Sequence, residues 1–260
     1  MGTFLDSTPA YIIVIALFVV MLATTMVGHF LALTRAKRNP ELVSEGIGSL
    51  EGALLGLVAL MLAFTFNMSA SRYDERREIV TEEANIIGTA ILRADLYPDS
   101  IREQFRKDFK QYVELRIQYH QSRPDVTDLQ NILKDGSAVS DRLWDRATAL
   151  SSDQHYQVAS MQMIPALNEM IDIVSVRFAA GIAKVPQSIL WFLFLLCAVA
   201  SFVVGYGKKG KHLDWIVVTG FLLMTSITVL LILDLDRPRR GLITMDYANE
   251  RIVELREMFK

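Results

Sequence analysis

Four charged side chains lie where the chain changes abruptly from apolar to charged sequence. Positions 52–71 carry no Asp, Glu, Lys or Arg, and neither glycine nor proline separates this stretch from the charges that follow. Charges three or four residues apart on a helix either pair and anchor a helix end at a membrane surface, or attract an anion. Of the two interpretations, we favour charges that pair and anchor the helix end. We call them the helix-end charge cluster: Arg72, Glu75, Arg76 and Arg77.

The chain contains none of the familiar enzyme or metal-site motifs. It has no glycine-rich phosphate loop, no His-Glu-x-x-His and no Gly-x-Ser-x-Gly. The four histidines fall in different segments, and Cys197 is the single cysteine. We therefore predict that the protein is not an enzyme and uses neither a cofactor nor a metal.

Four long stretches lack charged residues altogether. Hydrophobic residues make up 52% of the 260 residues, and each stretch has about the 20 residues that an α-helix needs to cross roughly 30 Å of hydrocarbon. Buried helices of soluble domains rarely run so long without a charge, and the first stretch is longer than the apolar part of a signal peptide. We predict four transmembrane helices, at 11–34, 52–71, 185–207 and 215–233.

The segment from 72 to 184 is polar, and its pattern is helical throughout. Apolar residues recur at alternating spacings of four and three from Val80 to Ala94. This pattern predicts that the second span continues as one helix to Tyr97. Pro98 then ends the helix, and Ser100 with Glu103 gives a capping-box pattern for the next one.

The remainder of this polar segment predicts further helices. Pro124 ends the helix that Ser100 begins, and a third helical region breaks near Gly136. A fourth region leads to the third span, with Pro165 at a kink or in its first turn. Its apolar stripe consists of Ile164, Leu167, Ile171, Val174 and Phe178.

These elements predict an all-α integral membrane protein with a helical soluble bundle inserted between the second and third of four transmembrane helices. The net charge of −2 gives no basic excess, so we expect the lipid bilayer, and no nucleic acid, as a partner. The predicted parts are two membrane helices in 1–71, a soluble domain at 72–184, two membrane helices in 185–233 and a helical tail at 234–260.

The stretch from Phe64 to Arg77 resembles, without a gap, the end of the pore helix in bacterial bestrophin anion channels. There a Phe is followed by Arg-Tyr or Arg-Trp and by Glu-x-Arg. The matching positions here are Phe64, Arg72, Tyr73, Glu75 and Arg77. The chain also resembles the bacterial proteins grouped as a bestrophin-like domain of unknown function, at 51–56, 83–85, 92–96 and 234–241.

This resemblance implies a homo-oligomer, a pentamer, in the bacterial inner membrane, with its axis lined by the second membrane helix. Gly56, Leu60 and Phe64 then lie at stacked levels of a pore, and Asn67 and Ser71 offer donors to a monovalent anion such as chloride. Alternatively, the apolar side chains simply pack against neighbouring helices. The second functional class is a non-conducting membrane scaffold or sensor whose soluble bundle binds a partner.

The residues and the resemblance disagree about membrane orientation. The loops at 35–51 and 208–214 are short and basic. The charges on the other side of the membrane are similar in number, but a long domain counts for little in the positive-inside rule. The rule therefore places the two loops in the cytoplasm and the soluble block outside. Bestrophins keep the equivalent soluble domain in the cytoplasm. Both orientations stay open at this point.

The calcium clasp of bestrophins has no match in the chain. Asp234 and Asp236 form an Asp-x-Asp pair after the fourth span, but two carboxylates supply far fewer than the roughly six to eight oxygens that calcium takes. The two residues either contribute to a site for a hard cation or pair with nearby arginines, which are Arg237, Arg239 and Arg240.

Overall fold

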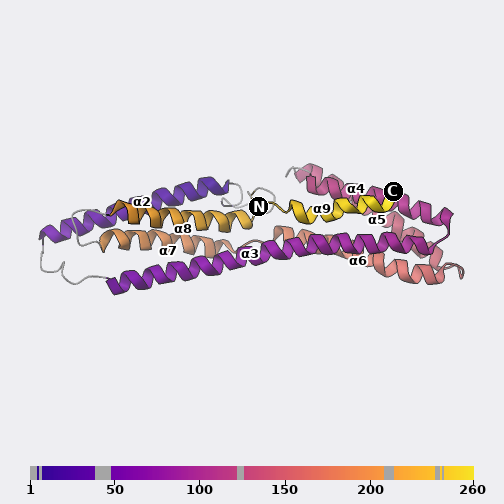
Figure 1. The fold of residues 1–260 in the computed structure, drawn as a ribbon, viewed down its shortest axis with the longest axis horizontal. Helices are drawn as coiled ribbons and strands as arrows, with labels where there is room; N and C mark the ends of the chain where they lie inside the picture. Colours follow the sequence, from indigo (N-terminus) through magenta and orange to yellow (C-terminus); the bar gives the residue numbers. More distant parts are fainter. Residues whose placement is uncertain are drawn as a thin grey trace. The chain divides into compact units, whose positions relative to one another are not determined.

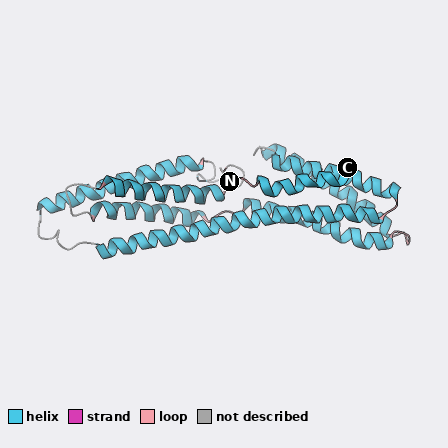
Figure 2. Ribbon diagram, viewed as in Figure 1, coloured by secondary structure: helices cyan, strands magenta, loops and turns pink. Residues whose placement is uncertain are grey.

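The computed structural model describes residues 5, 8–38, 48–121, 126–207, 214–237, 241 and 243–260, and no strand occurs in these ranges (Figures 1 and 2). The predicted all-α class is confirmed. The α-helices are α2 (Ala10–Arg38), α3 (Gly48–Arg93), α4 (Asp99–Gln121), α5 (Val126–Ser151), α6 (Gln157–Ile182), α7 (Gln187–Tyr206), α8 (Trp215–Leu235) and α9 (Asp246–Glu254), with short 3₁₀ helices η2 (Ala94–Leu96) and η3 (Leu255–Phe259).

The chain divides into two compact units. One, the membrane unit, comprises Met1–Tyr73 and Lys184–Ile243. The other, the soluble unit, comprises Asp74–Ala183 and Thr244–Lys260. Helix α3 contributes its first part to the membrane unit and its second part to the soluble unit.

The described residues contain four helical segments that are long and apolar enough to cross a membrane. Each holds one of the four predicted spans, so the protein is a multi-pass membrane protein. The segments are Ala10–Arg38, Gly48–Leu96, Gln157–Tyr206 and Trp215–Leu235.

Small residues let α2 and α7 approach closely in the membrane unit. A methyl group added at Gly205 would lie 2.1 Å from the carbonyl oxygen of Thr25, and one at Gly28 would lie 2.2 Å from that of Phe202. Between them, the Thr25 hydroxyl is within hydrogen-bonding distance of the carbonyls of Met21 (2.8 Å) and Ser201 (3.1 Å). Because lipid tails are as apolar as the side chains, such backbone-close packing is what holds membrane helices together.

The soluble unit has its own apolar core, built on the predicted seam of α3. Val80, Ala84, Ile87, Ile91 and Ala94 are all buried. They pack with apolar residues of α4, α5 and α6, as the periodicity predicts. The helix continues through Arg93 and η2 to Tyr97, so the predicted extension of the second span is also confirmed.

The C-terminal segment belongs to this same core. Ala248, Ile252 and Leu255 are buried in it. Arg256 forms two hydrogen bonds with the Glu114 carboxylate on α4, at 2.8 and 2.6 Å. The last helices of the chain are therefore fixed against the soluble bundle by both packing and charge.

Three local predictions concerned breaks and prolines in the helices of the soluble segment. The expected break near Gly136 was wrong, because α5 runs unbroken from Val126 to Ser151, with Val139 and Leu143 buried just beyond the glycine. Packing of those residues outweighs the roughly 1 kcal/mol that a glycine costs inside a helix. Pro165 lies inside α6, beyond its first turn. Pro124 lies outside the described residues, between α4 and α5.

The close approach of α2 and α7 leads to a prediction about folding. Replacing Gly205 by leucine forces the two backbones apart. It should lower the free energy of unfolding by about 1–3 kcal/mol or more, as overpacking does. The measurement is the yield of monodisperse protein and its thermal midpoint after extraction in mild detergent.

Gly220 on α8 provides the matched control, because a methyl group added there meets no atom within 4 Å. Gly220→Leu should behave like the wild type. Equal stability of the Gly205 and Gly220 variants would contradict the packing described here.

Candidate functional site: the exposed face of α3 and its charged end

The predicted pore residues share one face of α3 within the membrane unit. On an ideal helix, with 3.6 residues per turn, they fall within an arc of roughly 80°. All five are exposed in the single chain, and the side chains of Leu60 and Phe64 are exposed by 51% and 58%. The set is Gly56, Leu60, Phe64, Asn67 and Ser71, which we call the exposed face of α3.

The opposite face of the same helix segment packs inward. Val58, Thr65 and Ser69 are buried, and the Thr65 hydroxyl bonds to the carbonyl of Met61 on its own helix. Such back-bonding to the preceding turn satisfies a hydroxyl without a partner helix. The first part of α3 therefore has a packed side and an uncovered side within this chain.

The uncovered side combines apolar and polar groups in a defined order. Gly56 presents no side chain, Leu60 and Phe64 present bulky apolar groups, and Asn67 and Ser71 present an amide and a hydroxyl. The amide of Asn67 is costly to expose to hydrocarbon, because lipid offers it no hydrogen-bond partner. Water or a neighbouring protein surface suits this face better than lipid tails do.

In the helix-end charge cluster, Arg76 is buried and holds the end of another helix. It is 3% exposed. Its Nε donates to the carbonyl of Ala180 (3.1 Å), and its Nη2 donates to that of Ala183 (2.8 Å). The last carbonyls of a helix have no partners within the helix and carry partial negative charge. Arg76 therefore caps the C-terminus of α6.

The other members of the cluster are more accessible. Glu75 and Arg77 are exposed, and Arg72 is partly buried. Arg77 lies 4.0 Å from the Asp74 carboxylate, three residues away on the same helix, with both side chains more than half exposed. Ion pairs of this kind contribute little to stability. Only Arg76 of this cluster thus makes a buried capping contact.

A buried ion cluster that sequence reasoning did not identify lies further along α3. Glu83 is fully buried, and its two carboxylate oxygens accept hydrogen bonds from Arg116 on α4 and Arg177 on α6. Arg177 also donates to the side-chain oxygen of Asn249 on α9 (3.2 Å). The ring of Tyr119 lies 5.0 Å from the Arg116 guanidinium carbon and 5.5 Å from that of Arg177. The Glu83 carboxylate therefore joins α3, α4 and α6, and Asn249 connects α9 to this cluster through Arg177.

Arg116 keeps its positive charge in this cluster. Burial on its own would lower the pKa of Arg116, but the Glu83 carboxylate beside it and the hydrogen bond between them raise that pKa above its usual value. One carboxylate faces two guanidinium groups, so Glu83, Arg116 and Arg177 together carry a formal charge of +1.

The Asp-x-Asp pair after the fourth span binds backbone amides in the membrane unit. The Asp236 carboxylate accepts from the amide of Val185 (2.9 Å), and the Asp234 carboxylate accepts from that of Ile243 (2.8 Å). A methyl group added at Gly241 would lie 2.9 Å from the Asp234 carboxylate, so a larger residue there would have to displace that side chain. Arg237 donates to the carbonyl of Thr8 (2.6 Å), and Arg239 and Arg240 lie outside the described residues. Within the described ranges, no group of three His, Cys, Asp or Glu side chains is placed to hold a metal ion.

Two roles were not predicted from the sequence, the buried ion cluster at Glu83 and the capping contact of Arg76, and the sequence contains a signal for the first. Glu83 lies three residues after Val80, in register with the buried seam of α3, and a charge at such a position predicts a buried partner. The capping role of Arg76 had no such signal, because it depends on where the end of α6 lies in space.

Comparison with known proteins identifies relatives of the whole chain. A family model described as a Bestrophin-like domain matches residues 14–247. The fold is similar to crystal structures of two single-site mutants of a bacterial bestrophin homologue from Klebsiella pneumoniae. Their TM-scores are 0.67 and 0.61, with 14% and 13% identity, and the alignments cover 92% and 94% of this chain and 97% and 98% of theirs.

A crystal structure of a mutant membrane protein matches equally well. Its TM-score is 0.64 at 14% identity, over 94% of this chain and 98% of that one. At these identities the structural matches show a shared fold. A search of curated proteins finds no match.

The buried ion cluster yields a prediction for stability. Glu83→Gln removes the charge that both arginines face, and leaving a buried charge uncompensated costs about 3–5 kcal/mol. The thermal midpoint of the purified protein in detergent should fall clearly. Glu82→Gln is the control, because Glu82 is the exposed neighbour on the same helix. Equal midpoints for the two variants would show that the cluster is not needed for stability.

Proposed function

The chain belongs to the bestrophin-like domain family, and from this premise we propose that it is a subunit of an anion channel whose pore is lined by α3. Five copies assemble around a common axis in the bacterial inner membrane, and the exposed face of α3 lines that axis. The observation that carries the proposal is that all five residues of this face are uncovered in the single chain.

The polarity of the face supports a water-filled axis. Asn67 and Ser71 are exposed at the end of an apolar span, where lipid would leave their polar groups unpaired. Polar residues in transmembrane segments generally face a bundle interior or a water-filled cavity. A ring of copies supplies such a cavity and covers Leu60 and Phe64 at the same time.

The order of the side chains gives a physical mechanism for selectivity. Rings of Leu60 and Phe64 form an apolar constriction, which weakly hydrated anions cross more readily than strongly hydrated ions do because dehydration costs them less. Beyond it, the amide of Asn67 and the hydroxyl of Ser71 donate hydrogen bonds to the anion. Arg72 follows directly and adds positive charge, which raises the local anion concentration.

The proposal predicts how flux responds to truncation of the constriction. Phe64→Ala and Leu60→Ala widen the apolar rings and should increase chloride and nitrate flux several-fold in liposomes that contain the purified protein. Phe66→Ala is the matched control, because Phe66 is also exposed, by 40%, but lies on the other side of the same helix. It should leave flux unchanged.

The opposite outcomes are equally specific. A protein that is folded and inserted, yet conducts no anion even as Phe64→Ala or Leu60→Ala, is not a channel lined by this face. If it instead retains a stoichiometric protein partner through its soluble unit, the scaffold or sensor function is supported.

A further inference from the structure

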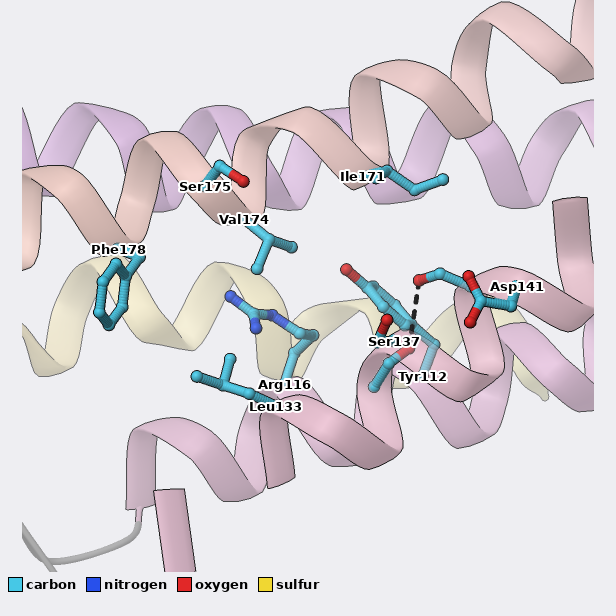
Figure 3. A pocket seen from close by; sticks show the side chains of 11 residues that line it. Tyr112, Arg116, Leu133, Ser137, Asp141, Ile171, Val174, Ser175 and Phe178 are labelled. Atoms are coloured by element: carbon cyan, nitrogen blue, oxygen red, sulfur yellow. Dashed lines mark hydrogen bonds between the residues drawn. The ribbon is translucent and has the colours of Figure 1, made fainter. Parts of the chain in front are cut away.

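A pocket of about 450 Å³ lies inside the soluble unit, between α4, α5 and α6 (Figure 3). This volume falls within the range of roughly 300–1,000 Å³ that is typical of small-molecule sites. Its lining combines a buried arginine, a buried tyrosine, three serines and one aspartate with an apolar wall. Such a wall with a few convergent polar groups is the usual composition of a ligand site.

The apolar wall comes mainly from the stripe on α6 that the sequence predicts. Leu167 of this stripe is fully buried in the core, but Ile171 and Phe178 are exposed by 37% and 52%. Val174 lies between them and faces Leu133 of α5 across the pocket (Figure 3). The stripe therefore leaves the core and continues as one wall of the pocket.

Tyr112 supplies an unused hydrogen-bond donor at the pocket. Its side chain is 1% exposed and extends toward α6 (Figure 3). Within the described part of the chain its hydroxyl makes no hydrogen bond. The Ser140 hydroxyl lies nearby and donates to the Gly136 carbonyl (3.1 Å). Burial raises the pKa of Tyr112 to about 12, so the phenol keeps its proton. Buried polar groups are seldom left unpaired, and one that lines a cavity points to a missing acceptor.

Arg116 gives the pocket its positive charge. Its Nε is bonded to Glu83, and the rest of the guanidinium group lies between Leu133 and Val174 (Figure 3). The cluster of Glu83, Arg116 and Arg177 carries a formal +1, as described above. In surroundings of low polarity an uncompensated charge favours an opposite charge nearby.

One acidic side chain also lines the pocket. Asp141 is exposed to solvent, and Tyr112 lies between it and Arg116 (Figure 3). The two charges therefore occupy different parts of the lining. An anion gains most at the Arg116 end, where the guanidinium is buried and less screened by water.

We propose that this pocket binds a small organic carboxylate with an apolar body. The carboxylate accepts hydrogen bonds from the Tyr112 hydroxyl and the Arg116 guanidinium, and the apolar body packs against Leu133, Val174 and Phe178. The proposal goes beyond anion conduction and does not depend on it, because it concerns only residues of the soluble unit.

The test uses hexanoate as the probe, with hexan-1-ol and hexylammonium as probes of matched length. Binding to the full chain in lipid nanodiscs is measured by saturation-transfer NMR and by the shift of the thermal midpoint. Hexanoate should bind and raise the midpoint, and the alcohol and the amine should bind at least about tenfold more weakly, as expected for the loss of a charge-assisted hydrogen bond.

Two variants and one control show whether hexanoate binds in this pocket. Val174→Trp fills the pocket and should abolish hexanoate binding, whereas Val158→Trp, on an exposed position of the same helix, should not. Tyr112→Phe removes only the unpaired hydroxyl, so it should leave the unliganded protein at least as stable and weaken hexanoate binding by roughly fivefold to tenfold.

Several results would overturn the proposal. Equal binding of hexanoate and hexanol would show an apolar site without anion recognition, and tighter binding of hexylammonium would assign the site to Asp141. Hexanoate binding unchanged by Val174→Trp would place the ligand elsewhere. A change of subunit number in Val174→Trp, with no hexanoate binding to the wild type, would show that a second copy of the chain covers the pocket.

Discussion

The constraint on which the membrane unit depends is that hydrocarbon offers no hydrogen bonds. The backbone groups of a helix bond to one another, and several threonine hydroxyls in the spans bond to a carbonyl of the preceding turn. Thr65 does so with Met61, and Thr228 does so with Met224 (2.9 Å). Asn67 has a larger amide and lies exposed on α3. The same constraint that makes the spans helical therefore calls for water or protein against this face, which is the physical basis for placing it at an oligomer axis.

The soluble unit is organised by a different constraint, a carboxylate that is removed from water. The Glu83 carboxylate accepts hydrogen bonds from Arg116 of α4 and Arg177 of α6, and Asn249 of α9 accepts one from Arg177 in turn. A buried cluster of this kind contributes little net stability but penalises any arrangement that separates its members. It fixes the register of these helices and leaves a positive charge beside the pocket.

The sequence predicted the features that depend on local pattern. The four charge-free stretches identified the spans, and the spacing from Val80 to Ala94 identified the buried seam of α3. The break expected at Gly136 was wrong because a single glycine is a weak signal, and buried neighbours such as Leu143 keep the helix intact.

Features that depend on which helices meet in space could not be predicted from the sequence. Arg76 looked like an interfacial charge, and its contact with the end of α6 exists only because the chain folds back by about a hundred residues. The stripe on α6 was predicted only as the apolar face of a helix that leads to the third span. That Phe178 remains half-exposed while Leu167 is buried reflects the position of α5, which no local spacing encodes. The five residues on the exposed face of α3 remain predicted pore residues.

We propose above that copies of this chain surround an axis lined by the exposed face of α3. Single-particle electron microscopy of the protein in lipid nanodiscs would show this arrangement. We expect a closed ring of five copies in which Phe64 and Leu60 face the central axis. A monomer, a dimer, or a ring in which Phe64 faces the lipid would contradict it.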